Sequence, residues 1–522
     1  MWFKNLIRSK TILLGLLIFI FLIAAEWVMH LTSIKDWNYD LNGLLFFGQR
    51  LLSGDLHWTS TFDDKLPIVQ FIFALPSAFE SIGVWVLMSI VSVFGGAWAC
   101  YIVVNDSLRA DLSLTSSERS KYSLLASFSM IYLSTFMHGG IHHINPMAAS
   151  AAISSIALLI IFFRKNQTNI VDYRYFVASA ALASVAIGIR PYFILMQLIA
   201  SIWVIARSEK KYSLQNVFTF WFFWIALTGI FGIIVNLLPY LVTGQLEAFW
   251  AGIQMLSQTL HPSSLTTVVG TIFYNFKNQS IVETVLIIGS TSSWIYAVVA
   301  LFKKNLPPLI RKISLDIIVL TLVLPSLLGL MIVTKHFWPH YMQMLAPFFS
   351  IGFSFIFYIF IRDLSINSRI IGTTLIATGV LASLPFFAES VNSVLDKKTI
   401  KLDRKVTEIS KFLDTQSEDQ RDFLFLDDMY VHWRLKESRH GFPHSANTLH
   451  ILRGFWQSVK MPKLFSHPTN GSEYCMALNS EGPTILVVSD QMLKFEIECL
   501  SKLSTYDLAK KLGDGTNIYT RK

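Results

Sequence analysis

Charged side chains are scarce in this chain. Of its 522 residues, 15% are Asp, Glu, Lys or Arg, whereas 53% are hydrophobic and the mean hydropathy is +0.50. Soluble domains carry roughly 25% charged residues, so the composition argues against an ordinary soluble enzyme. Apolar runs of about twenty residues recur through most of the sequence, the length that a helix needs to cross about 30 Å of hydrocarbon. We therefore expect a polytopic α-helical membrane protein.

Cysteine is also rare, and repeats are missing. Three cysteines do not make a disulfide framework. Cys100 falls in an apolar run and is predicted to be buried, whereas Cys475 and Cys499 could pair if the C-terminal region is exported. No internal repeat or low-complexity tract is visible, so the pattern gives no support to a repeat architecture.

The basic residues indicate an orientation rather than a nucleic-acid partner. The net charge is +9, but Lys and Arg cluster in short loops on one side of the apolar runs, as the positive-inside rule expects for cytoplasmic loops. This bias places the amino terminus in the cytoplasm and residues after about 390 outside. About eleven spans are expected, near residues 11–30, 79–103, 122–137, 146–163, 174–189, 191–207, 216–239, 283–302, 314–334, 341–361 and 369–388.

Two exterior regions have a different pattern. Residues 391–522 alternate between a helical segment (DRKVTEISKFLDTQ), strands (DFLFLD, TILVVSD), a second helix (QMLKFEIECLSKL) and a closing strand (TNIYTRK). This alternation predicts a small α/β domain outside the membrane, after a transmembrane domain of residues 1–390. Within the loop 239–283, GQLEAFWAGIQMLSQTL predicts a helix that lies on the membrane surface or covers the active site.

The first exterior loop, residues 36–67, holds acids near both of its ends. On a helix, Asp36 and Asp40 would share a face because they are four residues apart. Residues 41–52 are apolar enough to be buried, so Asp40 is expected to begin a buried helix, as a helix cap or as a catalytic group. Lys65, at the other end, is either an interface lysine or a cation directed at a phosphate.

The order of these residues resembles the pattern of the GT-C glycosyltransferases. That family has an acid just after the first span, an amphipathic helix that ends in an LL-x-G element, and then a D-x-KPP segment. Here the matching residues are Asp40, then Leu51-Leu52-Ser53-Gly54, then Asp64-Lys65-Leu66-Pro67, with leucine in place of the first proline. Within the family, the chain is similar to the bacterial branch of protein mannosyltransferases and aminoarabinose-to-lipid-A transferases. The resemblance implies that Asp40 is the catalytic base, that Lys65 contacts the donor phosphate, and that Asp36 and Asp64 bind substrate.

Two later segments agree with this resemblance over residues 1–390. HGGIHHINPMAASAA (138–152) lies where the family often has an acid before a proline, and this chain has Asn145-Pro146 instead, with His143 beside it. KHFWPHYMQMLAPF (335–348) resembles an aromatic-His-Tyr-x-x-Gln-x-x-Pro element of the family. The resemblance implies that both segments bind substrate. The alternative for the second segment is an aromatic belt at the membrane–water interface. The substrate-binding candidates are His143, Asn145, His336, His340, Tyr341 and Gln343.

Arg190 and the histidines have further interpretations. Arg190 lies in GIRPYF, where two apolar runs meet, and a lone arginine there is costly unless a phosphate or an acid pairs with it. By resemblance it belongs to the donor-binding region. His138, His142 and His143 invite a divalent metal, but their spacing is not that of a known site, so no cofactor is assigned.

The resemblance implies a multi-pass enzyme of the bacterial inner membrane. Its donor would be a polyprenyl-phosphate sugar, and its acceptor an envelope glycan, lipid or protein. A lipid-linked-sugar flippase would instead need ionisable residues near the membrane midplane. A glycan polymerase or ligase, and a receptor that uses the C-terminal domain to bind its ligand, remain alternatives.

Overall fold

The computed structural model divides the chain into two compact units. The helical unit comprises residues 1–32, 86–233 and 262–392, and the mixed unit comprises residues 33–85, 234–261 and 393–522. The structure describes residues 10–32, 39–59, 61–62, 65–137, 143–166, 172–208, 214–258, 281–302, 315–316, 318–319, 339–364, 380–381, 383–385, 387–388, 391–392, 398–417, 420–425, 429–435, 444–445, 476, 479–480, 482–488 and 504–522.

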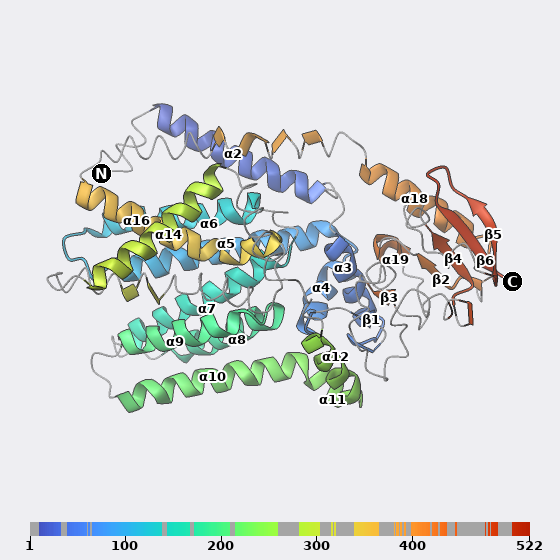
Figure 1. The fold of residues 1–522 in the computed structure, drawn as a ribbon, viewed down its shortest axis with the longest axis horizontal. Coiled ribbons are helices and arrows are strands. Elements are labelled where there is room, and N and C mark those ends of the chain that lie inside the picture. The colour runs from blue at the N-terminus through green and yellow to red at the C-terminus, as the bar shows by residue number, and fades with distance from the viewer. Residues whose placement is uncertain are drawn as a thin grey trace. The chain divides into compact units, whose positions relative to one another are not determined.

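Long helices make up the helical unit (Figure 1). The predicted spans that fall on described residues are helical, and the segments near 314–334 and 369–388 lie largely outside them. Within the described ranges, four helical stretches are long and apolar enough to cross a membrane: Ile82–Leu108, Asn145–Lys165, Gln215–Asn236 and Tyr341–Ile361. The helices are α2 (Lys10–Thr32), α5 (Ile82–Leu108), α6 (Ser116–Phe136), α7 (Asn145–Asn166), α8 (Tyr173–Ile189), α9 (Phe193–Ser208), α10 (Leu214–Asn236), α14 (Ile281–Phe302), the 3₁₀ helix η2 (Pro339–Leu345) and α16 (Ala346–Leu364).

Small residues and serines hold these helices together. A Cβ on Gly96 of α5 would lie 2.6 Å from Ser150 Oγ of α7, so only glycine permits this approach. Ser155 Oγ lies 3.1 Å from Ser179 Oγ of α8, which also accepts a hydrogen bond from Trp224 Nε1 of α10 at 3.0 Å. Small residues and interhelical hydrogen bonds are the usual means of packing helices in a bilayer, where apolar burial gives no drive for association.

A charged cluster of Asp106, Arg164, Arg207 and Asp316, which we call the Asp106 cluster, joins the carboxyl ends of α5, α7 and α9. Arg207 reaches Asp316 at 2.8 Å and Asp106 at 3.2 Å, and Arg164 forms an ion pair with Asp106. Asp316 is fully buried and also accepts a hydrogen bond from Trp203 Nε1 at 3.1 Å. Among the described residues of the cluster, two arginines pair with two aspartates, and such pairing is how buried charges are normally tolerated.

The mixed unit begins with two helices that pack against each other, α3 (Tyr39–Leu52) and α4 (Ile68–Ala78). The elements expected from the sequence leave out residues 68–78, which form the short apolar helix α4. Its Ser77 Oγ donates to the carbonyl of Leu45 in α3 at 2.6 Å. The periodicity of α4 is hard to separate from that of the following span, because both are apolar and only Glu80 and Ser81 interrupt them.

Gly48 marks the closest approach of α3 to α4. A Cβ there would lie 2.2 Å from the backbone oxygen of Phe73, which cannot move aside as a flexible side chain would. We expect Gly48→Ala to destabilise the protein by about 1–3 kcal/mol, the usual cost of overpacking. A lower melting temperature in detergent would show this. Gly229→Ala is the matched control, because nothing lies within 4 Å of its Cβ position; equal melting temperatures for the two variants would contradict the prediction.

The predicted helix of the loop 239–283 is confirmed as α12 (Leu246–Gln258), which follows the short helix α11 (Leu238–Val242). Its Phe249 packs with Tyr240 and Trp58 in a buried cluster, with ring centroids 5.3 and 5.9 Å away respectively. A Cβ on Gly252 would meet the Trp58 ring at 2.1 Å, so α12 lies directly on the loop between α3 and α4.

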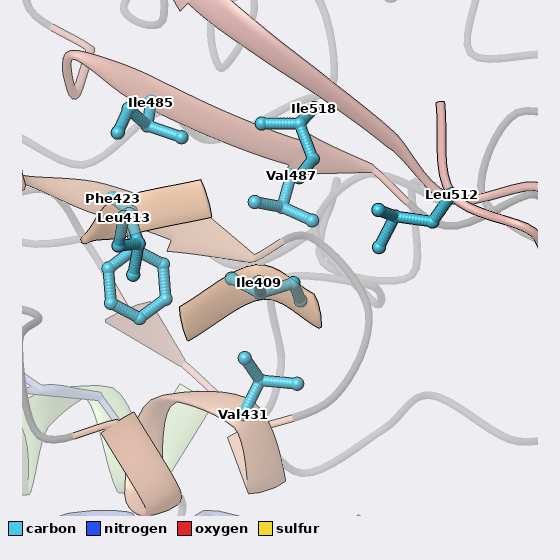
Figure 2. Close-up of a cluster of buried hydrophobic side chains, with 8 residues drawn as sticks. All are labelled: Ile409, Leu413, Phe423, Val431, Ile485, Val487, Leu512 and Ile518. Atoms are coloured by element: carbon cyan, nitrogen blue, oxygen red, sulfur yellow. The ribbon is translucent and has the colours of Figure 1, made fainter. Parts of the chain in front are cut away.

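The C-terminal part of the mixed unit contains a four-stranded sheet. Its strand order is β2-β4-β6-β5, with β2 parallel to β4 and the other pairs antiparallel. Figure 2 shows the buried side chains of helix α18 and of α19 against this sheet. The strands are β1 (Thr61–Phe62), β2 (Phe423–Phe425), β3 (His444–Ser445), β4 (Ile485–Val488), β5 (Tyr506–Lys511) and β6 (Asn517–Arg521), and the helices are α18 (Lys398–Leu413) and α19 (Met429–Leu435).

Several C-terminal predictions are confirmed at the level of these elements. The expected first helix is α18, and the expected strands are β2, β4 and β6. Helix α19 and strand β5 were not predicted, while the segment QMLKFEIECLSKL, Cys475 and Cys499 lie outside the described residues. Cys100 is buried, as predicted.

Candidate functional site

The helix predicted to carry the catalytic base is present. Asp40 is the second residue of α3 as described, although its side chain, like Asp36 and Asp64, lies outside the described part of the structure. The helix ends at Leu52, and Gly54 follows with φ +93°, a left-handed conformation that favours glycine. The glycine of the LL-x-G element therefore ends α3 and turns the chain.

Lys65 is 9% exposed, and a buried histidine holds its backbone. The Nε2 of His57 lies 3.0 Å from the carbonyl oxygen of Lys65. Because a carbonyl oxygen only accepts hydrogen bonds, His57 Nε2 carries a proton and donates it. The His57 N–H in turn donates to Gln70 Oε1 at 2.7 Å. Gln70 Nε2 then donates to the carbonyls of Phe47 and Asp55, both at 3.0 Å. The turn that presents Lys65 is thus tied to α3 and α4.

Aromatic side chains enclose this histidine. Its ring centroid lies 5.5 Å from that of Phe47 and 5.1 Å from that of Trp58. The hydroxyl of Tyr240 donates to the His57 carbonyl oxygen. Burial raises the pKa of Tyr240, so this hydroxyl remains a donor at any physiological pH. The sequence marked His57 only as one of the loop's polar residues; the aromatic residues around it were the available signal, but they are far apart in the chain.

In the helical unit, three predicted residues meet. Arg190 Nε donates to Asn145 Oδ1 at 2.7 Å, and the guanidinium carbon lies 5.0 Å from the ring centroid of Tyr341. All three are buried: Arg190 is 7%, Tyr341 3% and Asn145 0% exposed. They come from the carboxyl end of α8, from η2 and from the first residue of α7. We call them the Arg190 cluster.

The other predicted residues of this unit lie around η2 or outside the described part. Gln343 is buried and donates through Nε2 to the Met137 carbonyl oxygen at 2.7 Å, so it fixes η2 to the end of α6. His143 is half-buried and lies two residues before the start of α7. His340 is described only by its backbone in η2, and His336 lies outside the described residues.

The Arg190 cluster combines two features that favour anions in proteins generally. The amino end of a helix carries partial positive charge and free N–H groups, and α7 begins at Asn145, the residue that Arg190 contacts. A guanidinium is the preferred cation for phosphate, because it offers several donors in a planar fork. The stack on Tyr341 and the bond to Asn145 fix the plane of that fork.

The Arg190 cluster and the Asp106 cluster lie at opposite ends of α7. The helix has 22 residues, which at 1.5 Å per residue is about 33 Å, close to the hydrocarbon thickness of a bilayer. Polar groups gathered at the two ends of an apolar helix of this length match a transmembrane orientation. The predicted basic side is the end that carries Arg164 and Arg207.

No group of three or more potential metal ligands (His, Cys, Asp or Glu) occurs within the described ranges. Of the three histidines considered for a metal, His138 and His142 lie outside those ranges.

The fold is similar to that of ArnT, a likeness in keeping with the GT-C resemblance of the first-loop pattern. The chain is similar to the crystal structure of ArnT from Cupriavidus metallidurans bound to undecaprenyl phosphate, with a TM-score of 0.55 and 10% identity over 97% of each chain. A weaker likeness, with a TM-score of 0.49 and 11% identity, relates 100% of the chain to 75% of the archaeal oligosaccharyltransferase AglB from Archaeoglobus fulgidus in complex with an inhibitory peptide and a dolichol-phosphate. At these identities the likeness concerns the fold alone. No protein-family model and no curated protein matches the chain.

Proposed function

We propose that this protein is a membrane glycosyltransferase that moves a sugar from a polyprenyl-phosphate donor to an acceptor on the outer face of the membrane. The observation that carries the proposal is the Arg190 cluster, a buried guanidinium at the amino end of an apolar helix. The fold supports it, because the similar ArnT structure contains undecaprenyl phosphate, a lipid with the anionic group that such a cluster would bind.

Transfer from a lipid-phosphate sugar makes two chemical demands on the protein. The leaving phosphate must be stabilised as negative charge develops on it, and fixed cations do this best. Arg190 is assigned this role, and Lys65 keeps its predicted role as a donor-phosphate contact. The acceptor hydroxyl must also lose its proton, and a positioned carboxylate can take it. Asp40 is assigned that role.

The proposal includes the predicted topology. The chain would cross a bacterial inner membrane about eleven times, with a cytoplasmic amino terminus and the C-terminal α/β domain outside. Asp36, Asp64, His143, His336, His340, Tyr341 and Gln343 remain proposed substrate-binding residues, with Gln343 acting through the position of η2. The acceptor class is a glycan, lipid or protein of the cell envelope.

A flippase is the competing function from another class. It would carry ionisable residues near the middle of its spans. In α7, however, the charged and strongly polar residues are Asn145, Arg164, Lys165 and Asn166, at the two ends. This placement favours chemistry at the membrane surface over passage through the bilayer.

Proteoliposomes that contain the purified protein test the proposed function. Polyprenyl-phosphate sugars labelled in the sugar are supplied in the bilayer, and lipid, glycan and peptide acceptors are added on the outside. We expect label to move covalently to one acceptor class and free polyprenyl phosphate to accumulate. Label that crosses the bilayer still attached to its lipid, with no covalent product, would instead establish the flippase.

A further inference from the structure

We propose that the C-terminal region is a positioning element for the first exterior loop, and that it stays docked on that loop during the reaction. The inference rests on the proposed function, because it concerns the helix that carries Asp40 and the turn that carries Lys65. The mixed unit groups this region with residues 33–85, and two separate contacts connect them.

Other structural elements must enclose helix α3 on every side. Residues 41–48 are all buried, without a break. Eight consecutive helical residues cover more than two turns, so they point in all directions around the axis. A helix buried all round must be enclosed by other elements. Helix α4 covers the side of Gly48 and Leu45.

Helix α19 also contacts α3, and Figure 1 shows the two side by side. Its Val431 and Leu435 belong to the core of the C-terminal sheet. Trp433 lies about 200° around the helix from Val431, is 4% exposed, and is absent from that core. We infer that Trp433 packs against α3, so that α19 joins the C-terminal sheet to the helix of Asp40.

Strand pairing forms the second contact. Strand β1 pairs in parallel with β3, with Thr61 opposite His444 and Phe62 opposite Ser445. Strand β1 ends three residues before Lys65. The C-terminal region therefore touches the loop twice: at the helix that carries Asp40, and just ahead of the turn that carries Lys65. A domain that only recognised an acceptor would need neither contact.

Replacement of Trp433 tests the positioning role. In the full-length protein, Trp433→Ala is expected to lower kcat by about tenfold or more, because displacement of a catalytic group by about 1 Å can cost up to 100-fold. The KM for the lipid donor should stay within about twofold, and Trp433→Phe should restore most of the rate. Faster amide hydrogen exchange in α3 would accompany the loss. Trp250→Ala, at an exposed tryptophan of α12, is the matched control.

A disulfide tests whether the region stays docked. Neighbouring strands lie about 4.8 Å apart, within the Cα spacing that a disulfide accepts. Oxidation of the double variant Phe62→Cys, Ser445→Cys should leave the transfer rate within about twofold of its reduced form and of both single variants. Loss of activity on oxidation, restored by reductant, would overturn the inference and make the region a mobile arm.

These outcomes are separable from failure of the proposed function. A wild-type protein without transferase activity would disprove that function, whereas hydrogen exchange in α3 reports on the contact without any turnover. Unchanged exchange and unchanged kcat in a folded Trp433→Ala variant would overturn the positioning role. A change confined to the KM for the acceptor would also overturn it, because that result assigns the region to acceptor recognition.

Discussion

The Asp40→Asn variant is expected to lose transfer activity by about 100- to 10,000-fold, the usual contribution of a general base. Asparagine has nearly the same shape as aspartate but cannot accept the acceptor proton at neutral pH. In the first turn of α3, loss of the negative charge should cost only about 0.3–1 kcal/mol through the helix dipole. A large loss of transfer in a variant with a nearly unchanged melting temperature would therefore report on proton transfer and not on a weakened start of α3, which is the alternative role of Asp40.

Single-turnover transfer from labelled donor in proteoliposomes measures this effect, with the melting temperature as a check on folding. Asp55→Asn is the matched control in the same loop, where Asp55 forms an ion pair with Arg50. Such partly exposed pairs contribute about 0–1 kcal/mol to folding stability, so the transfer rate of Asp55→Asn should differ little from that of the wild type. Full transfer by a folded Asp40→Asn protein would remove the base from the proposal while leaving the phosphate site intact.

The second large effect is expected at Arg190. Hydrogen bonds to charged groups contribute about 1.5–3 kcal/mol, so Arg190→Gln should lower kcat/KM for the lipid donor by about 10- to 150-fold. Glutamine can still bond to Asn145 but carries no charge. Arg190→Lys keeps the charge without the planar fork, so its kcat/KM should lie between those of the wild type and of Arg190→Gln. Competition by undecaprenyl phosphate should weaken in the same order.

Arg174→Gln is the matched control for this experiment, because Arg174 lies at the other end of α8 and its side chain is 92% exposed. Donor kinetics should not change in that variant. Equal losses at Arg174 and Arg190 would indicate general damage to α8. An unchanged kcat/KM in Arg190→Gln would remove the phosphate role.

The sequence was most informative where apolar length or capping chemistry acts locally. Spans such as 146–163 and 174–189 correspond to α7 and α8, because a run of about twenty apolar residues has few other stable forms in a bilayer. Strands β2 and β4 followed from short β-branched or aromatic runs. Helix α4 was missed because its apolar pattern continues into that of α5, so the boundary between the two helices was hard to see in the sequence.

The sequence named the members of the Arg190 cluster but not their contacts. The high cost of a lone arginine between two apolar runs singled out Arg190 and required a partner. That Asn145 and Tyr341 lie beside it depends on how α7, α8 and η2 pack, across 45 residues in one case and about 150 in the other. No local pattern contains that information. The same is true of α19, which contacts a helix encoded near the other end of the chain.

The Asp106 cluster also has a consequence for synthesis of the chain. Asp106, Arg164 and Arg207 are all made before Asp316. Until residue 316 leaves the ribosome, the described part of this cluster holds two arginines and one aspartate, an excess of one positive charge. At about 5–20 residues per second, that interval lasts roughly 5 to 20 seconds. We therefore expect Arg207 to reach its final buried contacts only after residue 316 has been made.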